Sequence, residues 1–167
     1  MREIVLKTAS CGLYLPFWSA RILDEWRRAV VKLGPTQTMV ADGEIAMLHS
    51  QWPQAEIPAN PKLESELYLP DPADCHVLAS AIDAKADVIM TLNLKDFPRG
   101  TLAEFGLVAT HPDEVMRSFF DQNETVVRAI ATQVHAEAER LSGQDIPLRK
   151  LMKKAGMPRL GKALETQ

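Results

Sequence analysis

The stretch from residue 70 to residue 111 alternates between helix and strand patterns, and this order limits the possible folds more than any other feature of the sequence. A helix is predicted to begin at Asp74, and the apolar run Val88 to Leu92 that follows it has the length of a buried strand. A short helix at about 101–105 then leads to a second buried strand, Leu107 to Thr110. Helices that alternate with buried strands are typical of a parallel sheet, so an α/β fold is predicted.

The segments on either side of this stretch have mainly helical patterns. Before it, helices are predicted at 2–11, 20–33 and 36–51, with an extended segment or strand at 13–17 and a proline-containing loop passage at 52–72 that holds a short edge strand near 55–57. After it, helices are predicted from Pro112, over 123–141, and as two short pieces within 147–165. We therefore expect one domain over residues 1–120 and a helical extension over residues 121–167.

The composition excludes several classes of protein. Of the 167 residues, 46% are hydrophobic and 25% are charged, which is typical of a folded globular chain and not of a disordered one. The apolar runs are too short to cross a membrane, and no signal peptide is visible, so Cys11 and Cys75 are expected to be reduced thiols in the cytoplasm. The net charge of −3 does not fit a protein that coats DNA, but it fits an enzyme that holds nucleic acid through a metal ion and a local basic patch.

Motifs that the sequence lacks exclude several kinds of chemistry. Its histidines and cysteines have no zinc-binding spacing, its glycines form no phosphate-binding loop, and no serine lies in a nucleophile elbow. The remaining candidates are polar residues near the ends of predicted strands and helices: Glu25, Asp74, Asn93 and Asp96. Converging carboxylates repel one another unless a cation neutralises them, and oxygen ligands favour Mg²⁺ or Mn²⁺. Such a site suits metal-assisted hydrolysis of a phosphodiester.

Each of these residues also has a purely structural interpretation. Asp74 alone is more often a helix N-cap, and Asn93 and Asp96 are more often turn formers. Glu25 alone is most often a solvated helix acid that pairs with a neighbouring arginine. Only the order of the four residues along the chain favours a functional site.

That order is the one found in PIN domains, whose second half the stretch LPDPADCHVLASAIDAKADVIMTLNLKDFP (69–98) resembles. In that family an Asp begins a helix of small and apolar residues, and a buried strand then ends in Thr-x-Asn/Asp-x-x-Asp-Phe. The matching positions in this chain are Asp74, Thr91, Asn93, Asp96 and Phe97.

Three further segments resemble parts of the same family. LPFWSARILDEWRRAV (15–30) is similar to the segment that carries the family's helical glutamate, which falls on Glu25. GLVATHPDEVM (106–116) is similar to the last strand and the helix after it. The basic tail at 147–164 resembles the C-terminal extension of one VapC toxin subgroup. The resemblance therefore covers most of the chain.

The resemblance implies a three-layer α/β/α fold around a parallel sheet and a Mg²⁺- or Mn²⁺-dependent endoribonuclease. Such an enzyme is typically the toxin of a type II toxin–antitoxin pair, with RNA as its substrate and a cognate antitoxin that docks near the site and inhibits it. Glu25, Asp74 and Asp96 would be the acids that bind the metal. Asn93 would share in catalysis, and with Thr91 it would order the loop and hydrogen-bond the metal's water or the phosphate.

One part of the family pattern has no counterpart in this sequence. PIN domains begin with a central strand that ends in the first acid of the site, whereas no Asp precedes Asp24 here and no apolar strand precedes residue 13. We therefore expect an N-terminally truncated domain whose sheet is completed by an upstream sequence, another segment or a neighbouring subunit, or else a degenerate copy. As written, the chain is expected to bind metal weakly and to be slow or inactive.

Two other functions stay open at this point. One is a non-catalytic PIN-fold protein that binds RNA or the antitoxin, and the other is a different metal-dependent phosphoesterase on a similar sheet. Exposed sheet edges and the tryptophans Trp18, Trp26 and Trp52 would need cover, which indicates self-association, for example as a homodimer. The tail at 147–164 has six basic residues and no acid, and it is interpreted as a solvated face or as a surface for RNA or an acidic partner.

Overall fold

The computed structural model describes residues 1–32 and 34–165, and the chain forms two units that interleave along the sequence. One, which we call the helical unit, contains residues 1–15, 90–92 and the chain from residue 110 onward. The other, the α/β unit, contains residues 16–89 and 93–109. The first and last helices of the chain thus belong to the same unit.

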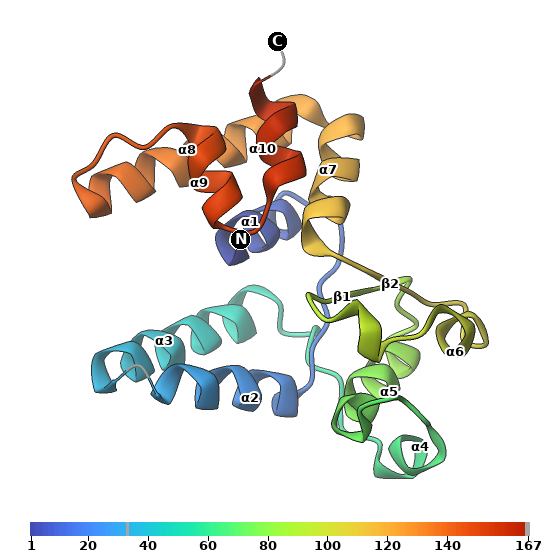
Figure 1. Cartoon of the computed structure of the whole chain (residues 1–167). Coiled ribbons are helices and arrows are strands. Elements are labelled where there is room, and N and C mark those ends of the chain that lie inside the picture. The colour runs from blue at the N-terminus through green and yellow to red at the C-terminus, as the bar shows by residue number, and fades with distance from the viewer. Residues whose placement is uncertain (33, 166–167) are drawn as a thin grey trace. The chain divides into compact units, whose positions relative to one another are not determined.

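The α/β unit contains five helices, two single-turn 3₁₀ helices and most of a two-stranded sheet within the described residues. They are α2 (Ala20–Val31), α3 (Pro35–Gln51), α4 (Pro61–Glu66), η1 (Pro72–Asp74), α5 (Cys75–Asp83), β1 (Val88–Met90), η2 (Leu94–Asp96), α6 (Arg99–Ala103) and β2 (Val108–Thr110). The strands are parallel, because Val108 N–H donates to Asp87 O (3.2 Å) and, further along both strands, Thr91 N–H donates to Thr110 O (3.1 Å). This parallel pair, joined through α6, confirms the predicted α/β class (Figure 1).

The strands are shorter than the sequence predicts. β1 ends at Met90 although the apolar pattern continues to Leu92, whose side chain is exposed. Residues 13–17, expected to be an extended segment or a strand, form no strand, and the edge strand expected near 55–57 is reduced to one isolated parallel bridge between Glu56 and Trp18. An apolar pattern alone therefore overestimates strand length here, because the length of a strand depends on how far its partner runs beside it, which the pattern does not show.

Helix α4 (Pro61–Glu66) lies in the passage that was predicted to be loop. Asn60 caps it, since its side-chain oxygen accepts the Leu63 N–H (3.1 Å), and proline occupies the first helical position. An Asn-Pro pair is a recognised helix start, so the signal was present in the sequence.

Two hydrophobic clusters stabilise the α/β unit. The larger one contains residues of α5, β1, α6 and the loops around them: Leu69, Cys75, Leu78, Ile89, Phe97, Leu102 and Leu107. The smaller one centres on Trp18, which is buried and meets Trp52 edge to face with 6.1 Å between ring centroids. These two tryptophans therefore find cover inside the chain and need no second copy to bury them, and the homodimer stays a prediction.

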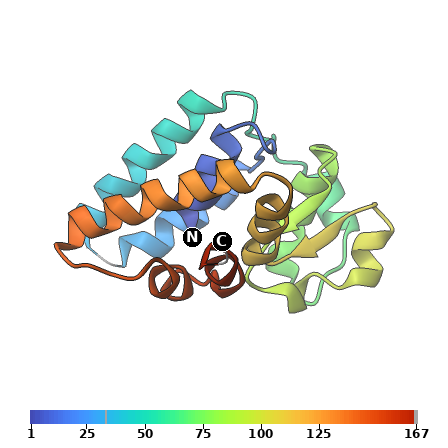
Figure 2. The same ribbon diagram turned by 90° about the horizontal axis from the view of Figure 1, so that it is seen from above.

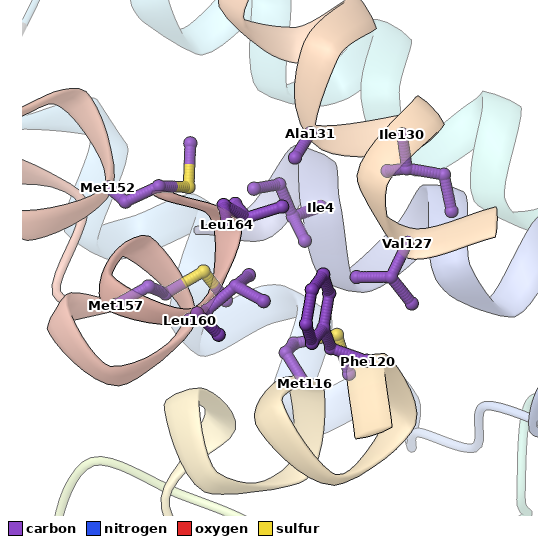
Figure 3. Close-up of a cluster of buried hydrophobic side chains, with 11 residues drawn as sticks. Ile4, Met116, Phe120, Val127, Ile130, Ala131, Met152, Met157, Leu160 and Leu164 are labelled. Atoms are coloured by element: carbon purple, nitrogen blue, oxygen red, sulfur yellow. The ribbon is translucent and has the colours of Figure 1, made fainter. Parts of the chain in front are cut away.

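The helical unit packs five helices around one apolar core. They are α1 (Arg2–Ser10), α7 (Pro112–Gln122), α8 (Glu124–Ser142), α9 (Leu148–Lys154) and α10 (Pro158–Glu165). Figure 3 shows Ile4, Phe120, Val127 and Leu160, from four different helices, pointing toward one another. Each helix contributes residues at helical spacing to this core, so its elements were predictable from periodicity.

The two C-terminal helices, α9 and α10, lie side by side (Figures 1 and 2). Gly156, whose φ is +75°, lies in the turn between them. The buried carboxylate of Asp113 in α7 accepts the backbone N–H groups of Arg159 (2.9 Å) and Leu160 (3.0 Å), so it satisfies two of the free donors at the start of α10. Cys11 and Cys75 are free thiols, and none of the described helices is long and apolar enough to cross a membrane.

Candidate metal centre

Three aspartates of the α/β unit lie together. Asp71, Asp74 and Asp96 each offer one carboxylate oxygen, and these oxygens all lie within 4.8 Å of one another. Asp96 is buried, with 8% of its surface exposed, whereas Asp74 is half-buried and Asp71 is exposed. The cluster is therefore anchored in the unit at Asp96 and reaches solvent at Asp71.

The apolar core holds these acids in place. Asp74 directly precedes Cys75, and Asp96 directly precedes Phe97, and both of these neighbours belong to the larger cluster of the α/β unit. Burial of the neighbouring residue fixes the backbone on which each acid sits. The sequence thus brings together two acids that are 22 positions apart by burying the residue after each of them.

Asp71 and Asp74 flank the single turn η1, and they have different roles in it. The side chain of Asp71 accepts the Ala73 N–H (2.9 Å), which closes the turn. Asp74 makes no side-chain capping bond to α5. The interpretation of Asp74 as an ordinary N-cap is therefore wrong, and its carboxylate is left for the cluster.

Asn93 and Asp96 flank the turn η2. The side-chain amide of Asn93 donates to Asp96 Oδ2, and the Asp96 N–H donates to Asn93 O (3.3 Å). Asn93 thereby holds one carboxylate oxygen of Asp96 and fixes the orientation of the other.

Glu25, which belongs to α2, lies close to the aspartates but is not one of the three clustered acids. Its side chain is 46% exposed, and Oε1 lies 3.1 Å from Arg21 Nε and 3.3 Å from His76 Nε2. His76 is 5% exposed, and neither ring nitrogen has a hydrogen-bond partner within the described chain. A buried imidazole without hydrogen bonds is costly, so the first turn of α5 carries an unsatisfied polar group next to Glu25.

Arg21 links three segments around the cluster. Besides Glu25, its guanidinium contacts Glu64 of α4 (2.9 Å) and donates to Ala73 O (3.3 Å). Ala73 directly precedes Asp74, so Arg21 ties α2 and α4 to the turn that carries Asp74. Glu25 thus pairs with the neighbouring Arg21, as its purely structural interpretation predicts. It also lies close to the aspartates.

The pKa of Asp74 is raised above its usual range. Burial is the largest cause, followed by the negative charges of Asp71 and Asp96 and, more weakly, that of Glu25, while His76 acts in the opposite direction. The cluster therefore gathers more negative charge than its surroundings neutralise. A cation bound among these oxygens would relieve that repulsion.

The donor set fits a hard divalent cation. All three clustered donors are carboxylate oxygens, the ligands that Mg²⁺ and Mn²⁺ prefer, and neither sulfur nor nitrogen belongs to the cluster. A zinc site would favour cysteine and histidine. Among the described residues this is an acidic cluster that could hold a divalent ion.

Of the residues singled out from the sequence, the structure brings Asp74, Asp96 and Asn93 together and places Glu25 next to them. Thr91 belongs to the helical unit, where its backbone N–H donates to Thr110 O. Asp71 was missed, because Asp-Pro is first of all a turn signal. Its spacing from Asp74 held the clue, since side chains at i and i+3 of a 3₁₀ turn eclipse one another.

Comparison with known proteins gives two similarities. A family model described as PIN domain matches residues 2–95, a little over half of the chain, so the match includes Asp71, Asp74 and Asn93 and ends one residue before Asp96. The chain is also similar to a Mycobacterium tuberculosis protein named "Putative ribonuclease VapC50", with 40% identity over 57 residues. That alignment covers 34% of this chain and 34% of the relative, about a third of its length. No solved structure matches the chain.

Proposed function

We propose, from the fact that this chain belongs to the PIN-domain family, that it is a metal-dependent endoribonuclease that hydrolyses RNA phosphodiester bonds. The observation that carries the proposal is the cluster of Asp71, Asp74 and Asp96, whose oxygens lie within 4.8 Å of one another. The similarity to a protein named as a ribonuclease supports RNA as the substrate. We further propose that the chain is the toxin of a toxin–antitoxin pair, with a cognate antitoxin that binds over the cluster and inhibits it.

In this proposal the aspartates hold Mg²⁺ or Mn²⁺. When bound there, such an ion would supply stabilisation of negative charge on the phosphate oxygens and a lowered pKa of the attacking water. Asp96 supplies the buried ligand, Asp74 the half-buried one, and Asp71 the ligand on the solvent side from which RNA can approach. Asn93 fixes the carboxylate of Asp96. Thr91, two residues before Asn93, would order the loop that follows β1.

Glu25 has two proposed contributions. As a fourth acid it adds negative charge beside Asp74, which increases the attraction for a divalent ion. Arg21 and His76 contact its carboxylate and so keep it on the side of the cluster. In this arrangement, the three aspartates bind the ion directly and Glu25 is available as a further ligand.

Cleavage of a labelled RNA by the full chain tests this function. We expect slow cleavage with Mg²⁺ or Mn²⁺, because the first acid of the family pattern has no counterpart here, and none with EDTA. Asp74→Asn and Asp96→Asn should lose roughly hundredfold or more of it, since even outer-shell changes at metal sites cost about 10–100-fold. Asp87→Asn, an exposed aspartate of the same unit, is the matched control and should cleave normally. Full cleavage in EDTA, or RNA binding with no cleavage in either metal, would contradict the proposal; the second result would favour a non-catalytic RNA-binding protein.

A further inference from the structure

Helix α9 carries three lysines on one face. Lys150, Lys153 and Lys154 are exposed and are spaced at i, i+3 and i+4, so their side chains leave the same side of the helix. The opposite side carries the buried Met152 and the half-buried Leu151, which pack into the core of the helical unit. The core therefore fixes the direction in which the lysines point.

Two acids of the helical unit pair with the arginines of the tail. Arg149 pairs with Glu165 (2.7 Å), and Arg159 pairs with Glu114. No carboxylate of the described residues lies within ion-pair distance of the three lysines. The two arginines of the tail are thus paired with carboxylates, whereas the three lysines of α9 have no ion-pair partner among the described residues, in a chain whose net charge is −3.

Helix stability does not account for this arrangement. Cations in the last turn of a helix interact favourably with its dipole, which explains Lys153 and Lys154. Lys150 lies in the first turn, where a cation is unfavourable, and like charges at these spacings repel one another. A lysine face that helix stability does not explain indicates that these side chains bind an external anion.

We propose that Lys150, Lys153 and Lys154 bind the phosphate backbone of single-stranded RNA. The apolar residues of α9 face the core, so no aromatic side chain lies among the lysines of this helix to stack on bases. No apolar side chain lies among them either, and a protein interface would need one as an anchor. Flexible lysine point charges suit phosphates and give binding without sequence preference. The choice of RNA rests on the proposed function, whereas the geometry of the lysine face does not.

The test measures binding of a fluorescein-labelled single-stranded RNA of mixed sequence to the full chain in EDTA, so that no metal-dependent cleavage occurs. In the triple variant Lys150→Gln, Lys153→Gln and Lys154→Gln, we expect roughly tenfold weaker binding at low salt. The slope of log affinity against log salt should fall by about 2, since each phosphate contact with a single strand contributes about 0.7. Glutamine is a good helix former, so α9 should stay folded, as circular dichroism can verify.

The control triple variant Lys32→Gln, Lys62→Gln and Lys85→Gln removes the same charge from exposed lysines of the α/β unit and should bind RNA as the parent chain does. Replacing the three α9 lysines with arginine should retain binding. The inference is overturned if the α9 glutamine variant binds normally, if the control loses as much, or if the chain binds polyglutamate or anionic vesicles but not RNA. If the α9 glutamine variant binds RNA as the parent chain does while metal-dependent cleavage is intact, only this inference is rejected. If the variant binds RNA more weakly but the parent chain shows no metal-dependent cleavage, only the proposed nuclease activity is rejected.

Discussion

At the scale of single residues, Asp74 illustrates how a site can oppose the stability of its own fold. Burial and the charges of Asp71 and Asp96 raise its pKa in the folded chain. The folded state therefore holds this proton more tightly than the unfolded chain does. The contribution of Asp74 to folding stability is complete at pH values below its ordinary pKa, and it is lost as pH rises through the raised pKa.

The substitution Asp74→Asn should therefore raise the Tm of the metal-free chain at neutral pH, with the gain vanishing in acid. The expected change is a few degrees, since about 1 kcal/mol shifts the Tm of a chain of this size by about 2–4 °C. Thermal scans in EDTA at several pH values measure it, with Asp87→Asn as the unchanged control. A lower Tm for Asp74→Asn at neutral pH would show that the carboxylate stabilises the fold.

Arg21 allows a second test at this scale, because one guanidinium contacts Glu25, Glu64 and Ala73 O. Lysine keeps the charge but cannot span three partners with a planar fork. Arg21→Lys should weaken Mn²⁺ binding several-fold, up to the 10–100-fold typical of outer-shell changes, with little change in Tm because the ion pairs are half exposed. Titration of Mn²⁺ followed by electron paramagnetic resonance measures this, and Arg28→Lys on the same helix is the control. If both variants bind Mn²⁺ equally well, Arg21 does not position the site.

At the scale of elements, periodicity predicted most helices but not what each one packs against. The helix predicted from Pro112 is observed, and the helices predicted at 20–33 and 123–141 are observed between the caps Ser19 and Gly143, since capping residues and glycines act locally. The short strands were overestimated, because strand pairing depends on distant segments. Asp113 lies in the first turn of α7, where an acid interacts favourably with the helix dipole, and it also caps α10, a contact that no local pattern could reveal.

Substitutions at two helical glycines distinguish the effect of side-chain packing on stability from the effect of helix propensity. A methyl group at Gly161 of α10 would lie 2.8 Å from Met152 Cβ of α9, whereas one at Gly43 of α3 would meet nothing within 4 Å. We expect Gly161→Ala to lower the free energy of unfolding by about 1–3 kcal/mol through overpacking. Gly43→Ala should raise it by about 0.5–1 kcal/mol, since alanine is the better helix former. Urea denaturation measures both changes, and a stabilising Gly161→Ala would contradict the close packing of α9 against α10.

At the scale of the whole molecule, the sequence showed the α/β class and the order of the site residues but not the interleaving of the two units. Ile4 has the pattern of a core residue, yet nothing local indicates that its partners are helices from the end of the chain. The acidic cluster was half predictable: Asp74 and Asp96 follow from position, whereas Asp71 depends on the eclipsed geometry of a 3₁₀ turn. Net charge was the least informative quantity, because −3 conceals both an acidic cluster and a lysine face.

Mn²⁺ binding to the full chain, followed by the loss of the free-ion signal in electron paramagnetic resonance, tests the central claim most directly. The claim is that Asp71, Asp74 and Asp96 together hold a divalent ion. We expect the parent chain and the Asp87→Asn control to bind Mn²⁺ alike, and each of Asp71→Asn, Asp74→Asn and Asp96→Asn to bind at least roughly tenfold more weakly. Unchanged binding in the variant that combines the three substitutions would show that the ion, if bound, is held elsewhere, and would contradict the account.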